Sequence, residues 1–224
     1  MESLPIYISI FFGIITAIAI WFFYKASNRS KLSVAVILIW LILQGIVASS
    51  GFYTITNTIP PRFTFLILPP VIFIIILFTT KSGKNFIDNL NPAYLVLFHT
   101  IRIAVEIVLF LLCIQKVIPS MMTFEGRNFD IVSGLTAPFI YYFGFIKKRL
   151  GRKILQAWNF ICLALLINIV ITAVLSAPFP FQQFAFDQPN IAILYFPFIW
   201  LPCFIVPAAL FCHLASIRRL LKEK

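Results

Sequence analysis

Charged side chains are scarce in this 224-residue sequence, of which only 11% is Asp, Glu, Lys or Arg. Ordinary soluble domains carry about 25%. Acidic residues are the scarcest, with seven Asp and Glu against 18 Lys and Arg, while hydrophobic residues make up 61% of the chain. A soluble domain of this length has too little interior to bury so much apolar side chain. The composition therefore excludes a water-soluble globular protein and predicts one that lies in lipid.

Histidine and cysteine are also rare, and the few present form no metal-binding pattern. The only histidines are His99 and His213, and the four cysteines lie in apolar runs without a CxxC pair. Zinc sites need Cys and His ligands at characteristic spacing, so we expect no metal and no other cofactor. A haem held between His99 and His213 is the alternative that these residues offer. The hydrolase motifs GxSxG and HExxH are absent.

Long apolar runs follow one another along the whole chain. A helix needs about 20 apolar residues to cross the ~30 Å hydrocarbon layer of a membrane. The runs predict an all-α fold, a polytopic transmembrane bundle of seven helices that forms a single domain over residues 1–224. The predicted spans are residues 5–24, 32–53, 63–80, 92–118, 131–147, 154–176 and 190–217.

Basic residues alternate between the loops that join these runs. The loops after the first, third and fifth runs and the tail after the seventh are rich in Lys and Arg, whereas the opposite loops hold only Arg62, Lys116 and Arg127. The positive-inside rule then places the N-terminus outside and the C-terminus in the cytoplasm. We expect a multi-pass protein of the inner (plasma) membrane whose basic loops meet anionic lipid, not nucleic acid. These basic residues are Lys25, Arg29, Lys31, Lys81, Lys84, Lys147, Lys148, Arg149, Arg152, Lys153, Arg218, Arg219, Lys222 and Lys224.

The stretch HTIRIAVE places His99, Arg102 and Glu106 inside the fourth apolar run. At about 100° per residue these three side chains share one face of a helix, within an arc of roughly 60°. That face is expected to point into the bundle, because a lipid-facing charge costs at least ~2.5 kcal/mol. With a rise of 1.5 Å per residue, Gln44 and Asn168 lie at about the same depth as Arg102 and Glu106. The four side chains form a predicted polar layer.

Two interpretations of this layer remain open. In the structural one, Arg102 and Glu106 pair at i, i+4 and neutralise each other, while Gln44 and Asn168 satisfy the remaining donors. In the functional one, the pair lines a cavity, and one partner binds a ligand or carries a proton. A buried ion pair is often no more stabilising than apolar packing, so the sequence favours the functional interpretation.

The loop before the fifth run is polar and lies on the outer side of the predicted topology. It holds Glu125, Arg127, Asn128 and Asp130 within six positions. Asp130 is predicted to cap the following helix, whose N-terminus favours an anion. The loop is either an ordinary solvated turn or a polar gate above the buried layer.

Two segments of the second half, TFEGRNFDIVSGLTAP (123–138) and FQQFAFDQPN (181–190), carry a resemblance. Together with HTIRIAVE they resemble an uncharacterised group of bacterial multi-pass membrane proteins. The resemblance implies a seven-span membrane fold. No activity is assigned to that group, so no catalytic residue carries over from it.

The leading prediction is an integral membrane protein with a buried polar site that opens outward and binds or transports a small molecule, ion or lipid-like ligand. Arg102 would hold an anionic or polar head group, and Glu106 would pair with it or take a proton. One alternative is an intramembrane enzyme on a lipid-like substrate with Glu106 or His99 as acid or base. Another is an accessory subunit of a larger membrane complex, with a membrane protein partner or as a homo-oligomer. The predicted ligand-binding residues are Gln44, Arg102, Glu106, Asn168, Glu125, Arg127, Asn128 and Asp130.

Overall fold

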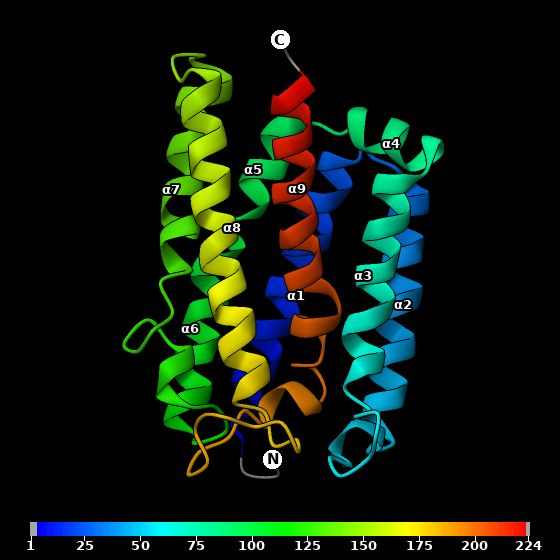
Figure 1. The fold of residues 1–224 in the computed structure, drawn as a ribbon, viewed down its shortest axis with the longest axis vertical. Helices are drawn as coiled ribbons and strands as arrows, with labels where there is room; N and C mark the ends of the chain where they lie inside the picture. Colours follow the sequence, from blue (N-terminus) through cyan, green and yellow to red (C-terminus); the bar gives the residue numbers. More distant parts are fainter. Residues whose placement is uncertain (1–3, 223–224) are drawn as a thin grey trace.

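The computed structural model describes residues 4–222, which contain no strand and whose long helices lie along one axis (Figure 1). The α-helices are α1 (Ile6–Ala26), α2 (Lys31–Ser49), α3 (Thr64–Thr79), α4 (Lys81–Asp88), α5 (Pro92–Phe98), α6 (Ile101–Ile114), α7 (Ile131–Tyr141), α8 (Arg152–Leu175) and α9 (Val206–Lys222). The 3-10 helices are η1 (Phe52–Thr54), η2 (Ser120–Met122) and η4 (Ala192–Leu194). The π-helices are η3 (Tyr142–Ile146) and η5 (Leu201–Ile205).

Polar residues fix where several helices begin. The side chains of Ser30 and Thr80 each accept a hydrogen bond, at 3.2 Å, from the backbone N–H three residues later, at the starts of α2 and α4. Asn91 accepts one at 3.1 Å from the residue two positions later, and Pro92 takes the first position of α5. These caps satisfy N–H groups that a helix leaves without partners at its N-terminus, where proline also fits.

Within the described residues, five helices are long and apolar enough to cross a membrane. They are α1, α2, the nearly continuous α5–α6 segment, α8, and η5 with α9. A sixth is counted only if α3 and α4 form one span, although the two are bent by 90°. A further apolar helix, Ile131–Ile146, is shorter. The all-helical class is confirmed, whereas the predicted count of seven spans is not established by length and composition.

Some predicted boundaries are wrong. The last span begins at Leu201 and runs to Lys222, because residues 190–200 form η4 and turns. The second span ends at Ser49, after which Gly51 adopts a φ of 75°, a left-handed conformation that glycine takes without strain. Residues 81–88, which lie in the loop between the third and fourth predicted spans, form α4.

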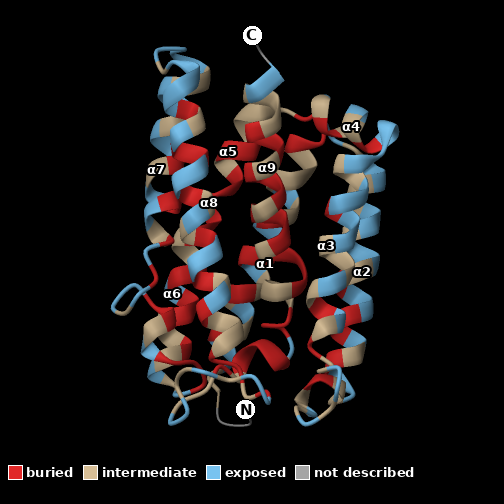
Figure 2. Ribbon diagram, in the orientation of Figure 1, coloured by how far each residue is buried: buried red, intermediate tan, exposed pale blue. Residues whose placement is uncertain are grey.

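The core lies around α5–α6 and α9. In an apolar stretch of 18 residues within each of these two segments 61% and 72% of the residues are buried, against 17–28% in the corresponding stretches of α1, α2 and α8. Figure 2 shows the same division, with buried residues concentrated at the centre of the bundle and exposed ones along the outer helices. The outer helices present mostly apolar side chains to their surroundings, as a lipid-facing surface requires.

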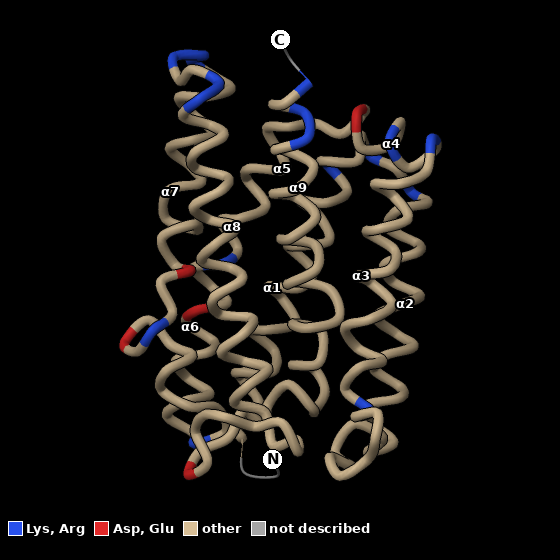
Figure 3. Tube along the Cα trace, in the orientation of Figure 1, with Lys and Arg blue, Asp and Glu red and all other residues tan. Residues whose placement is uncertain are grey.

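The two ends of the bundle differ in charge. Lys and Arg gather at the end where α9 finishes, on α4 and on the connection between η3 and α8 (Figure 3). The chain begins α1 at the opposite end (Figure 1). The alternation of basic loops in the sequence therefore becomes a separation of charge in space. Lys224, the last residue of the predicted basic tail, lies outside the described residues.

Candidate functional site

The helix that carries HTIRIAVE tightens where its polar residues begin. The N–H of His99 bonds to the carbonyl of Val96 and that of Arg102 to the carbonyl of His99, both at 3.1 Å. These bonds span three residues instead of four, which separates α5 from α6 by a 3-10 turn. Such a turn within a longer helix often marks a functional hinge. Arg102 thus lies at the start of α6 with its side chain only 4% exposed.

Arg102 joins three parts of the bundle. Its Nε lies 3.0 Å from Oδ2 of Asp130, immediately before α7, and its Nη1 lies 3.3 Å from Nε2 of His213 on α9. Arg102 is thus paired with Asp130 and not with Glu106, the partner that the i, i+4 spacing predicts. Asp130 holds the N-cap position of α7 as predicted, but its side chain makes no capping bond. The carboxylate turns instead toward the buried cation.

Glu106 is held by Asn128. The Nδ2 of Asn128 donates to Oε1 of Glu106 and, at 3.0 Å, to the carbonyl of Met122. The Oδ1 of Asn128 accepts from the backbone N–H of Asp130 at 3.0 Å, so one side chain holds the carboxylate of Glu106 and the backbone of Asp130. In the part of the chain that the structure describes, Oε2 of Glu106 has no hydrogen-bond partner. One oxygen of a buried carboxylate thus remains available.

The partners of His213 fix its tautomer. Arginine can only donate hydrogen bonds, so Nε2 of His213 accepts from Arg102. Nδ1 therefore carries the proton and donates to Oδ1 of Asn159 at 3.0 Å. The orientation of Asn159 is fixed in turn, because its Nδ2 donates to the carbonyl of Leu155 at 2.8 Å. His213 is a neutral link between Arg102 and α8.

His99 lies against this link without joining it by a hydrogen bond. Its ring stacks on that of His213 with centroids 3.8 Å apart and planes inclined by 14°, and Trp158 lies 5.7 Å from both rings. Neither nitrogen of His99 has a partner among the described residues. The nitrogen lone pairs of imidazole lie in the ring plane. Stacked rings direct them side by side, an arrangement that does not suit two axial ligands of one haem iron.

Only part of the predicted site comes together. We call the assembled group the polar cluster; its members are each at most 5% exposed. Four of them were predicted, while His213 was predicted only as a haem ligand and Asn159 was missed. The signal for Asn159 was a polar residue within an apolar run, the same signal that selected Asn168. The polar cluster consists of Arg102, Glu106, Asn128, Asp130, Asn159 and His213.

The other predicted residues lie elsewhere. Gln44 is buried on α2, where its Oε1 accepts from the hydroxyl of Tyr53. Asn168 is exposed on α8 and donates to the backbone carbonyl of Arg127 at 3.1 Å. The predicted common layer is therefore wrong for these two amides, because equal depth along a helix does not fix the direction in which a side chain points.

The loop between η2 and α7 divides between interior and surface. Asn128 and Asp130 point into the polar cluster, whereas Glu125 and Arg127 are exposed. The loop projects sideways from the bundle instead of covering one end (Figure 1). This loop therefore does not form a gate above the buried layer. Gly126 allows its tight turn, since a Cβ there would lie 2.4 Å from the carbonyl oxygen of Ser120.

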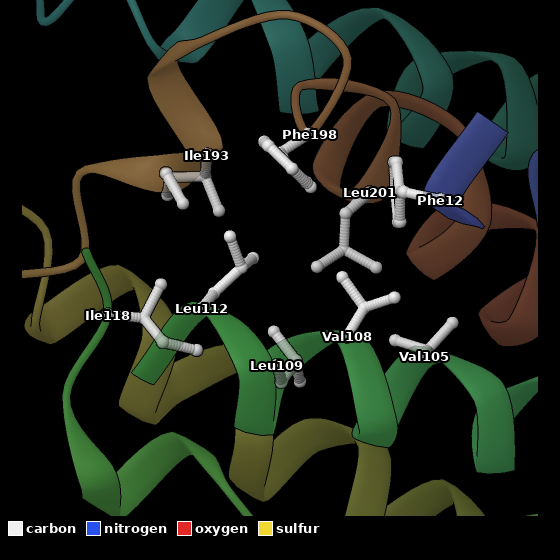
Figure 4. A pocket seen from close by; sticks show the side chains of 10 residues that line it. Phe12, Val105, Val108, Leu109, Leu112, Ile118, Ile193, Phe198 and Leu201 are labelled. Atoms are coloured by element: carbon white, nitrogen blue, oxygen red, sulfur yellow. The ribbon is translucent and has the colours of Figure 1, made fainter. Parts of the chain in front are cut away.

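A cavity next to α6 does not belong to the polar cluster. It holds about 10 Å³ and is lined only by apolar residues, among them Val105, Val108, Leu109 and Leu112 (Figure 4). A buried water needs about 10–15 Å³ and two to four polar partners, and this lining offers none. The members of the polar cluster are each at most 5% exposed, and none of them lines this cavity. Among the described residues, no three His, Cys, Asp or Glu side chains are placed to hold a metal ion.

The chain belongs to the family described as Domain of unknown function (DUF8737), whose family model matches residues 59–221. The match includes every member of the polar cluster and leaves out Gln44. It agrees with the resemblance to a group without assigned activity. No curated protein and no solved structure matches the chain.

Proposed function

We propose that this member of the DUF8737 family is an integral membrane protein that binds one proton or one small cation in the polar cluster, as part of transport across the membrane. A single observation carries the proposal. Two carboxylates, Glu106 and Asp130, lie in the same buried cluster as only one arginine, and all three residues are at most 5% exposed.

Counting charges shows what the polar cluster lacks. Arg102 is always protonated and is balanced by Asp130 at 3.0 Å. His213 is neutral, and Asn128 offers Glu106 only a neutral amide. With both carboxylates ionised, the cluster would hold one surplus negative charge in the membrane interior, where unpaired charges are expensive. A proton on Glu106 or a cation beside its open Oε2 restores neutrality.

The same contacts argue against an anionic ligand. Arg102 is already engaged through its Nε with Asp130 and through its Nη1 with His213, and among the described residues only its Nη2 has no partner. An anion would add a second surplus negative charge to the polar cluster. We therefore replace the role predicted for Arg102, which was to hold an anionic head group. In the present proposal Arg102 positions Asp130 and His213, and Glu106 binds the transported proton or cation.

We also infer the topology of the chain in the membrane. The proposed path has seven crossings, with α3 and the α7–η3 helix as the two short ones, the N-terminus outside and the basic end in the cytoplasm of a bacterial inner membrane. The support is the positive-inside rule together with the collection of basic residues at one end (Figure 3). Single cysteines at Lys148 and Asp187 in a cysteine-free background should react with a membrane-impermeant thiol reagent from opposite sides. Labelling of both from one side would contradict this topology.

The binding proposal is tested with Glu106→Gln, which mimics the neutral carboxyl, and with Glu125→Gln as control, since Glu125 is exposed. Infrared spectroscopy of the protein in liposomes detects a protonated carboxyl at neutral pH. Thermal unfolding in Na⁺, K⁺ or choline salts at equal ionic strength detects a bound cation, which stabilises by about 2.7 kcal/mol at 100 times its dissociation constant.

The two supporting outcomes differ in their signal. A proton predicts a carboxyl band at neutral pH that disappears in Glu106→Gln and persists in Glu125→Gln. A cation predicts stabilisation by Na⁺ or K⁺ that is lost only in Glu106→Gln. If the wild type shows neither signal, or if both variants behave alike, the polar cluster is a structural network and the proposal fails.

A second candidate function, a subunit of a larger membrane assembly, is favoured by one feature of the surface. Asn168 is exposed seven residues before the end of α8, which places it about 10 Å along the helix from that end. The exposed Glu125 and Arg127 lie in the loop that it contacts. Polar groups at this position avoid lipid if another protein covers them. Native mass spectrometry should then show a complex that Asn168→Leu with Arg127→Leu dissociates, whereas a wild-type monomer would exclude this function.

A further inference from the structure

A second cavity lies apart from the polar cluster, between the α2–α3 pair and α9. This groove has a volume of about 650 Å³, within the range of small-molecule sites. Its lining is mostly apolar and aromatic. The residues that define it include Phe23, Trp40, Phe73, Phe204, Pro207 and Phe211.

One end of the groove is closed by two tryptophan hydrogen bonds. Pro207 has no N–H, so the carbonyl of Cys203 lacks the donor that a continuous α-helix would place four residues later. Trp40 on α2 supplies the missing donor, since its Nε1 donates to the carbonyl oxygen of Cys203 at 3.0 Å. Trp200 donates in the opposite direction to the carbonyl of Leu41 at 3.1 Å. These bonds tie α2 to η5 and end the groove within the bundle.

The other end reaches the first turns of α2 and α4. Here the lining becomes polar, with Ser33, Thr80 and Ser82. α4 turns by 90° from α3 and closes over this end. The sharp bend depends on Gly83, because a Cβ there would lie 2.4 Å from the carbonyl oxygen of Leu77.

The polar end of the groove is also basic. Lys31 precedes the lining residues of α2, and Lys81 and Lys84 alternate with those of α4. No Asp or Glu occurs between residues 3 and 87. The nearest carboxylate in sequence, Asp88, is already bonded to Lys222 and Arg218 at the far end of α4. A negative group beside the first turns of α2 and α4 would therefore have Lys31, Lys81 and Lys84 as its charged neighbours on these two helices.

The length of the groove matches one leaflet of a bilayer. Along α3 its lining runs from Pro69 to Thr80, which is about 16 Å at 1.5 Å per residue. Half of the ~30 Å hydrocarbon layer is about 15 Å. A helix of that length and of the smallest usual diameter, about 10 Å, would fill about 1,250 Å³, so the groove is too small for a partner helix.

We propose that the groove holds an acyl chain of one anionic phospholipid from the leaflet at the basic end of the bundle. The chain lies against Phe73 and Phe204 and stops at Trp40. The head group lies beside Lys81 and Lys84, with the hydroxyl groups of the polar lining as further hydrogen-bond partners. This site does not depend on the charge bound in the polar cluster.

The test is native mass spectrometry of the purified protein in mild detergent, titrated with dioleoyl phosphatidylglycerol or dioleoyl phosphatidylcholine. Lys81→Gln with Lys84→Gln removes the head-group charges. The matched control is Lys148→Gln with Lys153→Gln, two exposed lysines at the same end of the bundle but outside the groove. Val36→Trp narrows the groove from a wall residue that is 47% exposed, a position where a larger side chain leaves the core intact. Circular dichroism confirms that each variant is folded.

The expected result is one phosphatidylglycerol per chain in the wild type and in the control. A lysine near a membrane surface contributes about 1 kcal/mol of attraction to anionic lipid, so removal of two should weaken binding about 10- to 30-fold. Val36→Trp should abolish the single bound lipid. Equal binding of phosphatidylcholine, equal weakening in the control pair, or retention of the lipid by Val36→Trp would each overturn the proposal.

Discussion

Replacement of Arg102 by methionine tests whether the polar cluster is held together as the structure shows. Methionine keeps the length and flexibility of the side chain and removes its charge and donors. Asp130 then loses the partner that lies 3.0 Å away, and Nε2 of His213 loses its donor. Both Asp130 and His213 are at most 5% exposed, so water cannot replace the lost contacts.

The magnitude follows from the burial of the pair. Breaking a buried ion pair by removing one partner costs about 3–5 kcal/mol, since the other charge is left uncompensated. For a chain of this length 1 kcal/mol lowers the melting temperature by about 2–4 °C, so Arg102→Met should melt about 6–20 °C below the wild type. Arg102→Met with Asp130→Asn removes both charges and should regain more than half of the loss.

The assay is thermal unfolding in detergent, followed by circular dichroism, with Arg127→Met as the matched control. Arg127 is an exposed arginine in the loop that carries Asn128 and Asp130, and its replacement should change the melting temperature by less than about 2 °C. An Arg102→Met protein with the same melting temperature as Arg127→Met would contradict a buried ion pair. A double variant less stable than Arg102→Met would contradict it as well.

Three further predictions concern other parts of the bundle. Gly134→Ala should lower the free energy of unfolding by about 1–3 kcal/mol, because the added Cβ would lie 2.9 Å from a backbone nitrogen of α6. Gly13→Ala is the control for thermal unfolding and should not destabilise the protein, since a Cβ there would meet nothing within 4 Å. The hydrogen bond from Lys222 lowers the pKa of Asp88 from its ordinary value of 3.8. The stabilisation that Asp88 contributes should therefore be complete above about pH 5 and disappear as the pH falls through that lowered pKa. In pH-dependent melting curves Asp88→Asn should be less stable than the wild type at pH 7 and converge with it only once the pH is below that lowered pKa. Trp40→Phe removes the donor to the carbonyl of Cys203 and should lower the free energy of unfolding by about 1–3 kcal/mol; an unchanged melting temperature would contradict the closure of the groove.

The helical class and most helix positions could be predicted because hydrophobic run length is a local property of the sequence. The ends were less predictable where proline and glycine decide the backbone. Residues 190–200 are as apolar as a span, yet Pro197 interrupts the run and the helix starts only at Leu201. α4 was missed because a short polar helix at a membrane surface has no long apolar signal.

The residues of the candidate site that share a face of one helix could be predicted from the sequence. The contacts that they make with other helices could not. The period of 3.6 residues placed Arg102 and Glu106 on one buried face, as the structure has them. The partner of each depends on how neighbouring helices are rotated about their axes, which depth alone does not determine. Asn159 and Asn168 differ by nine residues on α8, and only Asn159 points inward.

The bond between Arg102 and His213 has a consequence for the order in which the membrane fold can be completed. α9 follows α2 and α6 in the chain and is synthesised after them, and it supplies His213 as well as part of the wall of the groove. Until η5 and α9 enter the membrane, Arg102 lacks one of its acceptors and α2 lacks the carbonyl of Cys203 that Trp40 binds. The chain therefore remains open on one side during insertion, and a protein truncated before Leu201 should be recognised as incomplete and degraded.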